Sequence, residues 1–550
     1  MPDQCATTTV TRTVTVASGV FAPGHLGELT QLLPFELVDD VLERTRAVQR
    51  RLRLIPSRVG VCFVLAMCLF PEVGYLRVWS HLTAGVRALV AKVPSEKALR
   101  EVRRRLGAAP FQELFETVAG PLARPSTPGV SYRRWRTVAF DGCSSLQAPD
   151  TLRVRGVLGK TRRHRGVEGY PHVRLMALCE TGTRGLLGAV FGSTSTGEPG
   201  YARRLLPLLN GSMLLLVDRN LSGDEFLNDV ADTGAQLLAR LTYRRRPAVI
   251  SVLPDGSYLT RLRGRTFRII EADVTANCAD GSRVADRYRL ATTLLDHQAD
   301  PADRLVALYH ERWEIELSFL ALKDTLFAGR VLRSGDPVGL QQELWALLVV
   351  YQSLRRAMVD AVESRPGTDP DRASFTVALC TAAEQVITAR AVLEPADGHG
   401  SIAQAVLGAL LPPRRARTSA RLVKCPISQY TVVSQERPRK SRRITSVRVA
   451  VHRRDETEPD DLGFRERTLR LLRTDPGRAW RTVEISKALG ITVTAKYRSL
   501  CTQINRWAEQ TMLIREGRGR YRIAPEWLAP TTSEDVKSDL PRFVIARSWY

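Results

Sequence analysis

Two short apolar segments that each end in an aspartate constrain the fold more than any other feature of the chain. Residues 137–141 read TVAFD and residues 213–218 read MLLLVD. Runs of this length and composition are typical of strands buried inside a sheet. Their surroundings predict further strands at 172–180, 185–193 and 235–241, and helices at 199–209 and 222–234. This order predicts a mixed sheet flanked by helices, that is, an α/β fold.

The region before this sheet, residues 26–123, has apolar residues at helical spacing. Ser95 is placed to cap a helix that ends at Gly107. The apolar run at 59–70 is shorter than the ~20 residues that a membrane span needs, so a buried helix is expected there. The basic residues of the helix after Ser95 are expected to form a solvated face, with phosphate contact as the alternative; they are Arg100, Arg103, Arg104 and Arg105.

The region after the sheet is predicted to contain three different kinds of structure. Residues 242–300 show short strand patterns separated by Gly and Asp turns and indicate a β-rich insertion. Helices follow at 301–328, 338–362 and 372–394. Residues 412–454 hold thirteen Arg or Lys and one acidic residue, half of the net charge, and are expected to be an irregular basic arm. Residues 461–528 have the order of a winged helix-turn-helix: three helices and a Gly-centred hairpin.

Composition limits the class of protein and its partners. The chain has 550 residues and a net charge of +24, which favour several domains and a polyanionic partner, most often nucleic acid. The nine cysteines are scattered without a CxxC pair, which argues for a reducing compartment and against a zinc module. The N-terminus shows no signal peptide, so a cytoplasmic protein is expected.

Asp141 and Asp218 are the first candidates for catalysis. A carboxylate at the end of a buried strand is held rigidly at the rim of a sheet, which suits Mg²⁺ coordination because this ion prefers hard oxygen ligands. The alternative for each residue is an aspartate that merely begins a turn, as Asp141–Gly142 would.

A predicted helix around residues 308–326 supplies the third candidate. Tyr309, Arg312, Glu316 and Lys323 fall within one arc of about 60° on a helical wheel, between apolar flanks. Polar side chains in such a position are costly without a partner, and a metal-bound phosphodiester would provide one. Glu316 would complete the metal site, and the other three would hold phosphate oxygens. An Arg312–Glu316 ion pair at i,i+4 is the alternative, but it explains only two of the four residues.

These motifs resemble the insertion sequence 4 family of DDE transposases. The family's Tyr-x2-Arg-x3-Glu-x6-Lys signature is matched by Tyr309, Arg312, Glu316 and Lys323, and its Asp-Gly and Asp-Arg motifs by Asp141–Gly142 and Asp218–Arg219. The resemblance covers about residues 26–400, because VPSEKALREVRRRLG and FQELF are also similar to the family's N-terminal domain.

The resemblance implies a ribonuclease H-like core with a β insertion, in which Asp141, Asp218 and Glu316 hold two Mg²⁺ ions, with Mn²⁺ as a substitute. Tyr309, Arg312, Lys323 and Arg219 would bind DNA phosphates. It implies cleavage of double-stranded DNA at element ends and joining to a target by a homodimer. Four domains are expected. They are a helical N-terminal domain at 20–123, the catalytic domain at 124–400 with its insertion at 242–300, a basic linker or arm at 401–460, and a winged helix at 461–530.

The chain departs from the family pattern in two places. Some relatives are thought to stack a flipped base on a tryptophan of the insertion, whereas this chain has no tryptophan between Trp135 and Trp313. Tyr258, Phe267 or Tyr288 could substitute, although ordinary strand packing is favoured for each. The C-terminal winged helix is not part of the family's core; Lys496, Arg498 and Arg506 mark its predicted recognition helix.

Two alternative functions stay open on the sequence. One is a DNA-binding regulator derived from an inactive transposase, and the other is a ribonuclease H-like nuclease without strand transfer. The presence of all three carboxylates argues against the regulator.

Overall fold

The computed structural model describes residues 24–51, 55–89, 93–160, 162–163, 166–167, 169–242, 245, 247–279, 281, 283–311, 325–326, 329–389, 401–412, 417–419, 441–452, 464–491 and 494–528. Its contacts divide the chain into two compact units. The first unit comprises Met1–Leu214 and Glu311–Arg443, and the second comprises Leu215–His310 and Ile444–Tyr550. The predicted domain limits remain a prediction.

The N-terminal part of the first unit is helical, as predicted. Its elements are α2 (Leu29–Leu32), α3 (Phe35–Arg44), α4 (Ser57–Leu69), α5 (Tyr75–Thr83), η1 (Ala84–Leu89), α6 (Glu96–Leu106) and α7 (Ala109–Val118). Helix α4 is buried almost throughout, which confirms the buried helix expected at 59–70. Ser95 caps α6 by accepting from the amide of Ala98, and α6 ends at Gly107 with a φ of 65°.

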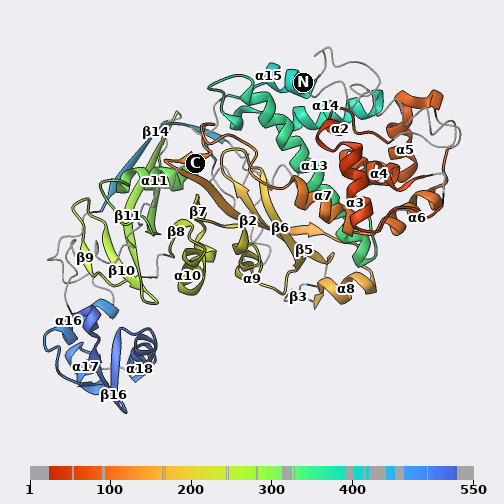
Figure 1. Ribbon diagram of the computed structural model, residues 1–550. Helices are drawn as coiled ribbons and strands as arrows, with labels where there is room; N and C mark the ends of the chain where they lie inside the picture. Colours follow the sequence, from red (N-terminus) through yellow and green to blue (C-terminus); the bar gives the residue numbers. More distant parts are fainter. Residues whose placement is uncertain are drawn as a thin grey trace, which may run out of the picture. The chain divides into compact units, whose positions relative to one another are not determined.

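These helices gather around a long helix from the C-terminal half of the same unit, α13 (Pro337–Glu363) (Figure 1). Helix α13 is buried over most of its 27 residues, and it packs against α4 and α7. The shorter helices α14 (Phe375–Thr388) and α15 (Ile402–Gly408) lie against it as well. Because α13 is buried on nearly all sides, it forms the centre of this helical core.

The sheet of the first unit is antiparallel where its pairing is described. Strand β2 (Trp135–Gln147) pairs with β1 (Ser131–Tyr132) and with β5 (His172–Glu180), and β5 pairs with β6 (Leu186–Ser193). Between and after these strands lie α8 (Leu152–Leu158), β3 (Arg162–Arg163), β4 (Gly166–Val167), α9 (Glu198–Arg203) and η2 (Leu206–Leu208).

Strand β2 corrects one expectation. The predicted strand ended at Asp141, whereas β2 continues six residues further to Gln147. The extension follows from pairing with β5, since Asp141 lies opposite Ala177 and Gly142 opposite Met176. Asp141 is therefore inside a strand and does not begin a turn.

The second unit contains the expected β-rich insertion. Its strands β9 (Ser251–Val252), β10 (Tyr258–Leu262), β11 (Arg265–Cys278) and β12 (Arg283–Thr292) follow β7 (Met213–Val217), η3 (Arg219–Leu221), α10 (Asp224–Asp232) and β8 (Gln236–Arg240). The order across the sheet is β14, β11, β12, β8 and β7, and β10 also pairs with β11. Helix α11 (Ala302–Glu311) comes after β12.

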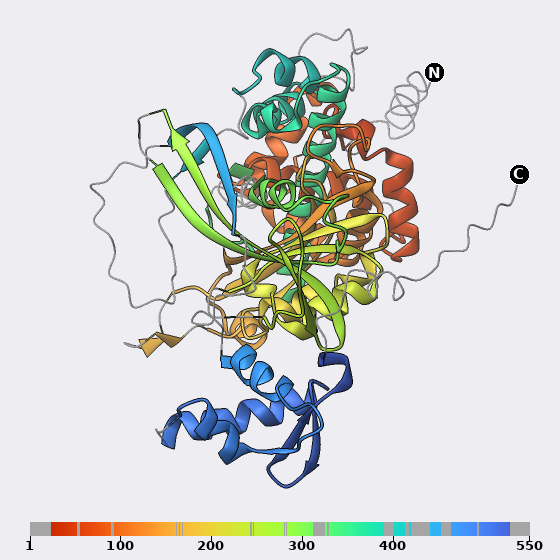
Figure 2. The ribbon, with the colours of Figure 1, turned by 90° about the vertical axis from the view of Figure 1, so that its left-hand side faces the viewer.

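Strand β14 (Ser441–Val451) corrects a second expectation, the irregular basic arm. It pairs antiparallel with β11 from Cys278↔Ile444 to Ala272↔Val451, and the two strands form a long ribbon with β12 (Figure 2). The segment ITSVRVAV (444–451) is rich in β-branched residues, which favour a strand once a partner is present. A short strand, β13 (Arg417–Ser419), pairs with its start.

The C-terminal part of the second unit has the predicted three helices and hairpin. Its helices are α16 (Phe464–Arg473), α17 (Thr482–Ala488) and α18 (Thr494–Glu509). They accompany a sheet of β15 (Trp480–Arg481), β17 (Arg520–Ile523) and β16 (Leu513–Gly517), and η7 (Pro525–Trp527) is the last described element. Leu469, Ile485, Ile504 and Trp507 are buried together in its core. Across the described residues, no helix combines the length and the apolar character needed to cross a membrane.

Candidate active site

Asp141 is positioned by the middle of β2. Its side chain is half-buried, and its Oδ1 accepts a hydrogen bond from the amide of Gly142 at 2.9 Å. Because β2 is paired with β5 from Val138 to Cys143, on both sides of this residue, the backbone that carries the carboxylate is held by strand pairing. The sequence therefore identified a well-fixed carboxylate, although not at a strand end.

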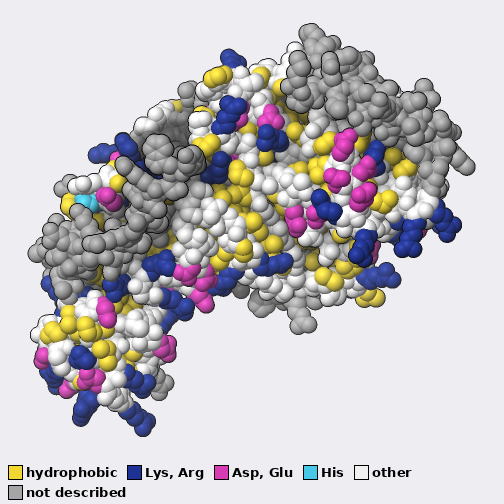
Figure 3. All heavy atoms as spheres, in the orientation of Figure 1, with side chains coloured by type: hydrophobic (Ala, Val, Ile, Leu, Met, Phe, Trp, Pro, Cys, Tyr) yellow, Lys and Arg dark blue, Asp and Glu magenta, His cyan; other side chains and the backbone are white. Residues whose placement is uncertain are grey.

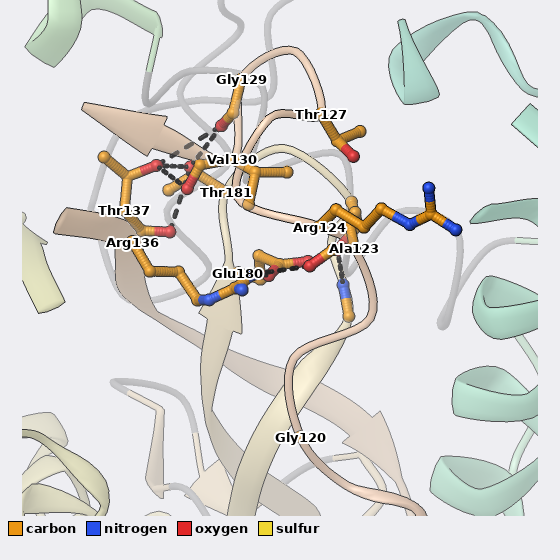
Figure 4. Close-up of polar contacts among 12 residues, drawn as sticks. Gly120, Ala123, Arg124, Thr127, Gly129, Val130, Arg136, Thr137, Glu180 and Thr181 are labelled. Carbon is orange, nitrogen blue, oxygen red and sulfur yellow. Dashed lines mark hydrogen bonds and ion pairs between the residues drawn. The ribbon is translucent and has the colours of Figure 1, made fainter. Parts of the chain in front are cut away.

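The start of β2 is held by a polar network that the sequence did not reveal (Figure 4). Arg136 donates to the buried carboxylate of Glu180 and, at 3.1 Å, to the carbonyl of Ala123. Thr137 Oγ1 donates to the carbonyl of Val130 at 3.0 Å, and Thr181 Oγ1 also lies within hydrogen-bond distance of Thr137 Oγ1. Glu180 and Arg136 are far apart in the sequence, so only the pairing of β2 with β5 brings them together.

Asp218 lies directly after β7, as predicted. Its backbone is extended, with φ −71° and ψ 156°, and its carbonyl accepts from the amide of Leu221 at 2.9 Å in η3. Arg245 stabilises this turn, because it donates to the carbonyl of Ser222 and forms an ion pair with Asp224. Strand β7 is fully buried and Asp218 is half-buried, so the carboxylate stands where the chain leaves the core. Arg219, the next residue, is exposed.

Tyr309 has a different position from the one expected. It lies in α11 with 1% of its surface exposed, and its hydroxyl donates to the carbonyl of Val217 at 3.0 Å. Its ring also meets the ring of Tyr288 edge-on, with centroids 5.8 Å apart. The expected role was phosphate binding, whereas the structure directs this hydroxyl to the backbone beside Asp218.

The structure does not bring the three carboxylates together in one described site. Glu316, Arg312 and Lys323 lie outside the described residues. Asp141 belongs to the first unit and Asp218 to the second, and each is described within its own unit. Within the described ranges, no group of three or more His, Cys, Asp or Glu residues is placed to hold a metal ion. The convergence of Asp141, Asp218 and Glu316 therefore remains a prediction.

The three insertion aromatics considered for base stacking are buried. Tyr258 is 1% exposed, Phe267 0% and Tyr288 1%, which confirms ordinary strand packing for each. The hydroxyl of Tyr258 donates to Glu271 Oε1 at 2.9 Å. No exposed stacking face is offered by these three residues.

The basic face of α6 is only partly as expected. Arg100 pairs with Glu96 and Arg104 with Glu101 at the surface, as on a solvated face. Arg103, however, is 6% exposed and forms a buried ion pair with Glu343 of α13, with 2.7 Å between Nη2 and Oε1. Its acidic partner is 240 residues away, so helical periodicity alone could not show that Arg103 faces the core.

The predicted recognition helix corresponds to α18. Arg506 is exposed in its last turn, while the side chains of Lys496 and Arg498 lie outside the described residues. Arg515, Arg518 and Arg520 are exposed on the β16–β17 hairpin. Figure 3 shows Lys and Arg side chains on the visible face of this part of the molecule.

Comparisons with known proteins address the family directly. A family model described as "Insertion element 4 transposase N-terminal" matches residues 23–116, and one described as "Transposase DDE domain" matches residues 144–352. The second match includes Asp218 and Glu316 and begins three residues after Asp141. The matches extend to neither β14 nor the C-terminal helices.

Among curated proteins, the chain is similar to the transposase InsG for insertion sequence element IS4 of Escherichia coli (strain K12). The two are 26% identical over 415 residues, which cover 72% of this chain and 92% of that protein. A cryo-EM structure of the piggyBac transposase synaptic complex with hairpin DNA overlaps 70% of this chain and 84% of its own, at 10% identity and a TM-score of 0.35. A TM-score of that size does not establish a shared fold. The two family matches and the relative together show that this chain belongs to the insertion sequence 4 family of DDE transposases, enzymes that cleave and transfer DNA strands.

Proposed function

We propose that this transposase cleaves double-stranded DNA at the ends of its insertion element and joins those ends to target DNA, with Asp141, Asp218 and Glu316 as its catalytic carboxylates. The observation that carries the proposal is the hydrogen bond from Tyr309 to the carbonyl of Val217. This bond brings the first residue of the Tyr-x2-Arg-x3-Glu-x6-Lys signature to the residue that precedes Asp218. The second aspartate and the segment leading to Glu316 are thereby close in space although 91 residues separate Tyr309 from Asp218 in the sequence.

The donor set fits two divalent metal ions. Carboxylate oxygens are the ligands that Mg²⁺ prefers, and Asp141 and Asp218 are both half-buried on hydrogen-bonded backbone. Asp141, Asp218 and Glu316 would hold the ions, with Mn²⁺ as a substitute for Mg²⁺. When bound, such a pair activates the attacking oxygen and stabilises the leaving oxygen of a phosphodiester.

The remaining signature residues are proposed to hold the DNA backbone. Arg219 is exposed directly beside Asp218, where a guanidinium can contact a phosphate near the reacting group. Arg312 and Lys323 are assigned the same role because the sequence pattern predicts that they share one helical arc with Glu316. Cationic donors placed there neutralise the charge that accumulates on the phosphate during cleavage.

The C-terminal part is proposed to be a winged helix-turn-helix that binds DNA. Helix α18 would enter the major groove with Lys496, Arg498 and Arg506, and the basic β16–β17 hairpin would contact the backbone. We further propose a ribonuclease H-like core, a homodimer on paired element ends and a location in the cytoplasm on the nucleoid. The regulator alternative is not favoured, since the chain keeps all three carboxylates.

The test is a cleavage and joining assay with purified full-length protein, Mg²⁺ and DNA that carries the element ends. Glu316→Gln is expected to lower cleavage at least 1,000-fold and to leave end binding within about twofold of wild type. Glu314→Gln is the matched control, because this acid lies two residues away and outside the predicted polar arc. Chelation of divalent metal should abolish cleavage of the wild type.

Three results would contradict the proposal. Unimpaired cleavage by Glu316→Gln would remove the catalytic assignment. Cleavage without joined products would indicate a nuclease, and end binding without any metal-dependent cleavage by the wild type would indicate the regulator.

A further inference from the structure

Helix α11 is held at both ends by side chains from the β-rich insertion. At its C-terminal end, Tyr309 contacts the ring of Tyr288, which lies on β12 and is 1% exposed. Tyr288 is in turn covered by Arg240 of β8, whose guanidinium carbon lies 4.4 Å from the ring centroid. An ion pair with Asp286 holds this guanidinium in place, with 2.9 Å between Nη2 of Arg240 and Oδ2 of Asp286. The ring of Tyr309 is therefore packed in a defined orientation against the insertion.

The other end of α11 is held by Arg268 of β11, which is fully buried. Its Nη1 donates at 2.7 Å to the carbonyl of Asp300, two residues before the helix begins. Its Nε donates to Ser257 Oγ at 2.8 Å, and its Nη2 pairs with Asp255. Nη1 also reaches the carbonyl of Leu294 at 3.5 Å. A guanidinium that donates to two carbonyls, one hydroxyl and one carboxylate fixes the loop that enters α11.

Between these two anchors, the hydroxyl of Tyr309 connects α11 to the end of β7. A phenol has a single hydrogen, and here it is donated to the carbonyl of Val217. Phosphate oxygens without a proton only accept hydrogen bonds, so this hydroxyl cannot donate to DNA while it keeps Val217. The contact sets the distance between the backbone of Asp218 and helix α11. Glu316 lies seven residues after Tyr309 in the sequence.

We propose that Tyr309 is a positioning residue: its hydroxyl fixes α11 against the end of β7, and the insertion, through Tyr288 and Arg268, keeps α11 in that place. This inference rests on the proposed roles of Asp218 and Glu316. It gives the insertion of this chain a role in assembling the metal site, separate from any contact with DNA. Because a displacement of about 1 Å in a catalytic site can lower a rate about 100-fold, loss of one hydroxyl at this point should be visible in cleavage.

The test compares Tyr309→Phe with Tyr201→Phe in the full-length protein. Tyr201 is a matched control: it is a buried helix tyrosine whose hydroxyl donates to the carbonyl of Ser193, the last residue of β6, at 2.9 Å. Both variants lose one buried hydroxyl bonded to a strand-end carbonyl and keep the ring. They should therefore lose similar amounts of thermal stability.

Five readouts are measured on each variant: end cleavage, its Mg²⁺ dependence, end binding, amide hydrogen exchange and Mn²⁺ binding. Tyr309→Phe should lower end cleavage by about 10- to 100-fold, raise the Mg²⁺ concentration for half-maximal cleavage at least threefold and leave end binding unchanged. In the DNA-free and metal-free protein, it should also speed amide hydrogen exchange in 216–221 and 305–311 together. Mn²⁺ binding by calorimetry should weaken in parallel. Tyr201→Phe should stay within twofold of wild type in cleavage and in metal response.

The outcomes separate this inference from the proposed function. If Tyr309→Phe cleaves within twofold of wild type, or if its loss equals that of Tyr201→Phe, Tyr309 is not a positioning residue even though Glu316→Gln is inactive. If cleavage falls but the metal response and the exchange of both segments stay unchanged, the positioning role is wrong and direct contact of Tyr309 with DNA is indicated. If Glu316→Gln is fully active, the proposed site itself fails.

Discussion

The buried ion pair between Arg103 and Glu343 yields the most quantitative prediction. Arg103 reaches from α6 to α13 and donates to Glu343 Oε1 at 2.7 Å, to Ser334 Oγ at 2.8 Å and to Gln342 Oε1 at 3.0 Å. Both charged side chains are 6% exposed. Arg103→Met keeps much of the side-chain length but removes the charge, which leaves the carboxylate of Glu343 buried without its cation.

The expected cost follows from the contacts that remain. Removing one partner of a buried pair costs about 3–5 kcal/mol. Glu343 would keep two hydrogen bonds, from the amide of Arg333 and from Ser334 Oγ, both at 2.7 Å, which places the loss near the lower limit, about 3 kcal/mol. At roughly 2 °C per kcal/mol for a large domain, the melting temperature should fall by about 6 °C.

The assay is thermal unfolding of the full-length protein, followed by amide exchange of α6 and α13 to locate the effect. The double variant Arg103→Met with Glu343→Gln restores charge neutrality: the amide oxygen can still accept from the backbone amide of Arg333, and the amide NH₂ can donate to Ser334 Oγ. It should recover at least about half of the loss, because the unpaired charge and not the missing contact is the main cost. The reasoning is refuted if Arg103→Met unfolds within about 1 °C of wild type or if the double variant is less stable than the single one.

Three further predictions concern pH and DNA. Burial lowers the pKa of His25 to about 4, against a weaker opposite effect of the Leu82 backbone. The contribution of neutral His25 to stability is therefore fully present above pH 6.5, and about 3 kcal/mol of it is lost as the pH falls from 6.5 to about 4. Urea titrations should show this loss in the wild type and not in His25→Gln. Burial raises the pKa of Glu180, and Thr183 and Arg136 only partly oppose it, so its contribution to stability falls as the pH rises above 4.5; Glu180→Gln should flatten that slope. Arg506→Ala should reduce the slope of log affinity against log salt by about 0.9 if its guanidinium contacts one phosphate, and an unchanged slope would exclude that contact.

Local signals predicted much of the fold. The cap at Ser95, the stop at Gly107 and the apolar run at 59–70 gave α6 and α4, because each depends on residues within one helix. Alternation and turn residues gave β5, β6 and β8 for the same reason.

Features that depend on distant pairing were missed. Strand β2 continues beyond Asp141 only because β5 lies beside it, and β14 is a strand only because it pairs with β11, about 170 residues earlier. The high positive charge of residues 412–454 led to the prediction of an irregular arm, although the β-branched residues of β14 favour a strand. In the same way, Arg103 looked like part of a solvated face because Glu343 was unknown as its partner.

Within the candidate site, the place of Asp218 could be predicted from the sequence, whereas the partner of Tyr309 could not. Asp218 follows β7 as the apolar run indicated. The acceptor of Tyr309 is a backbone carbonyl, which every residue carries, so no sequence pattern marks Val217 as its partner. A helical wheel shows which residues share a face, and it does not show whether that face meets DNA or the protein's own strand.

The central claim is that Asp141, Asp218 and Glu316 hold the same pair of metal ions. Replacing Mg²⁺ by Fe²⁺ and generating hydroxyl radicals with ascorbate and peroxide cuts the backbone only next to bound iron, and mass spectrometry then reads the cut positions. The account predicts cuts around 141, 218 and 316 that disappear together in Glu316→Gln. Cuts at only one of these segments, or cuts at all three that persist in Glu316→Gln, would contradict it.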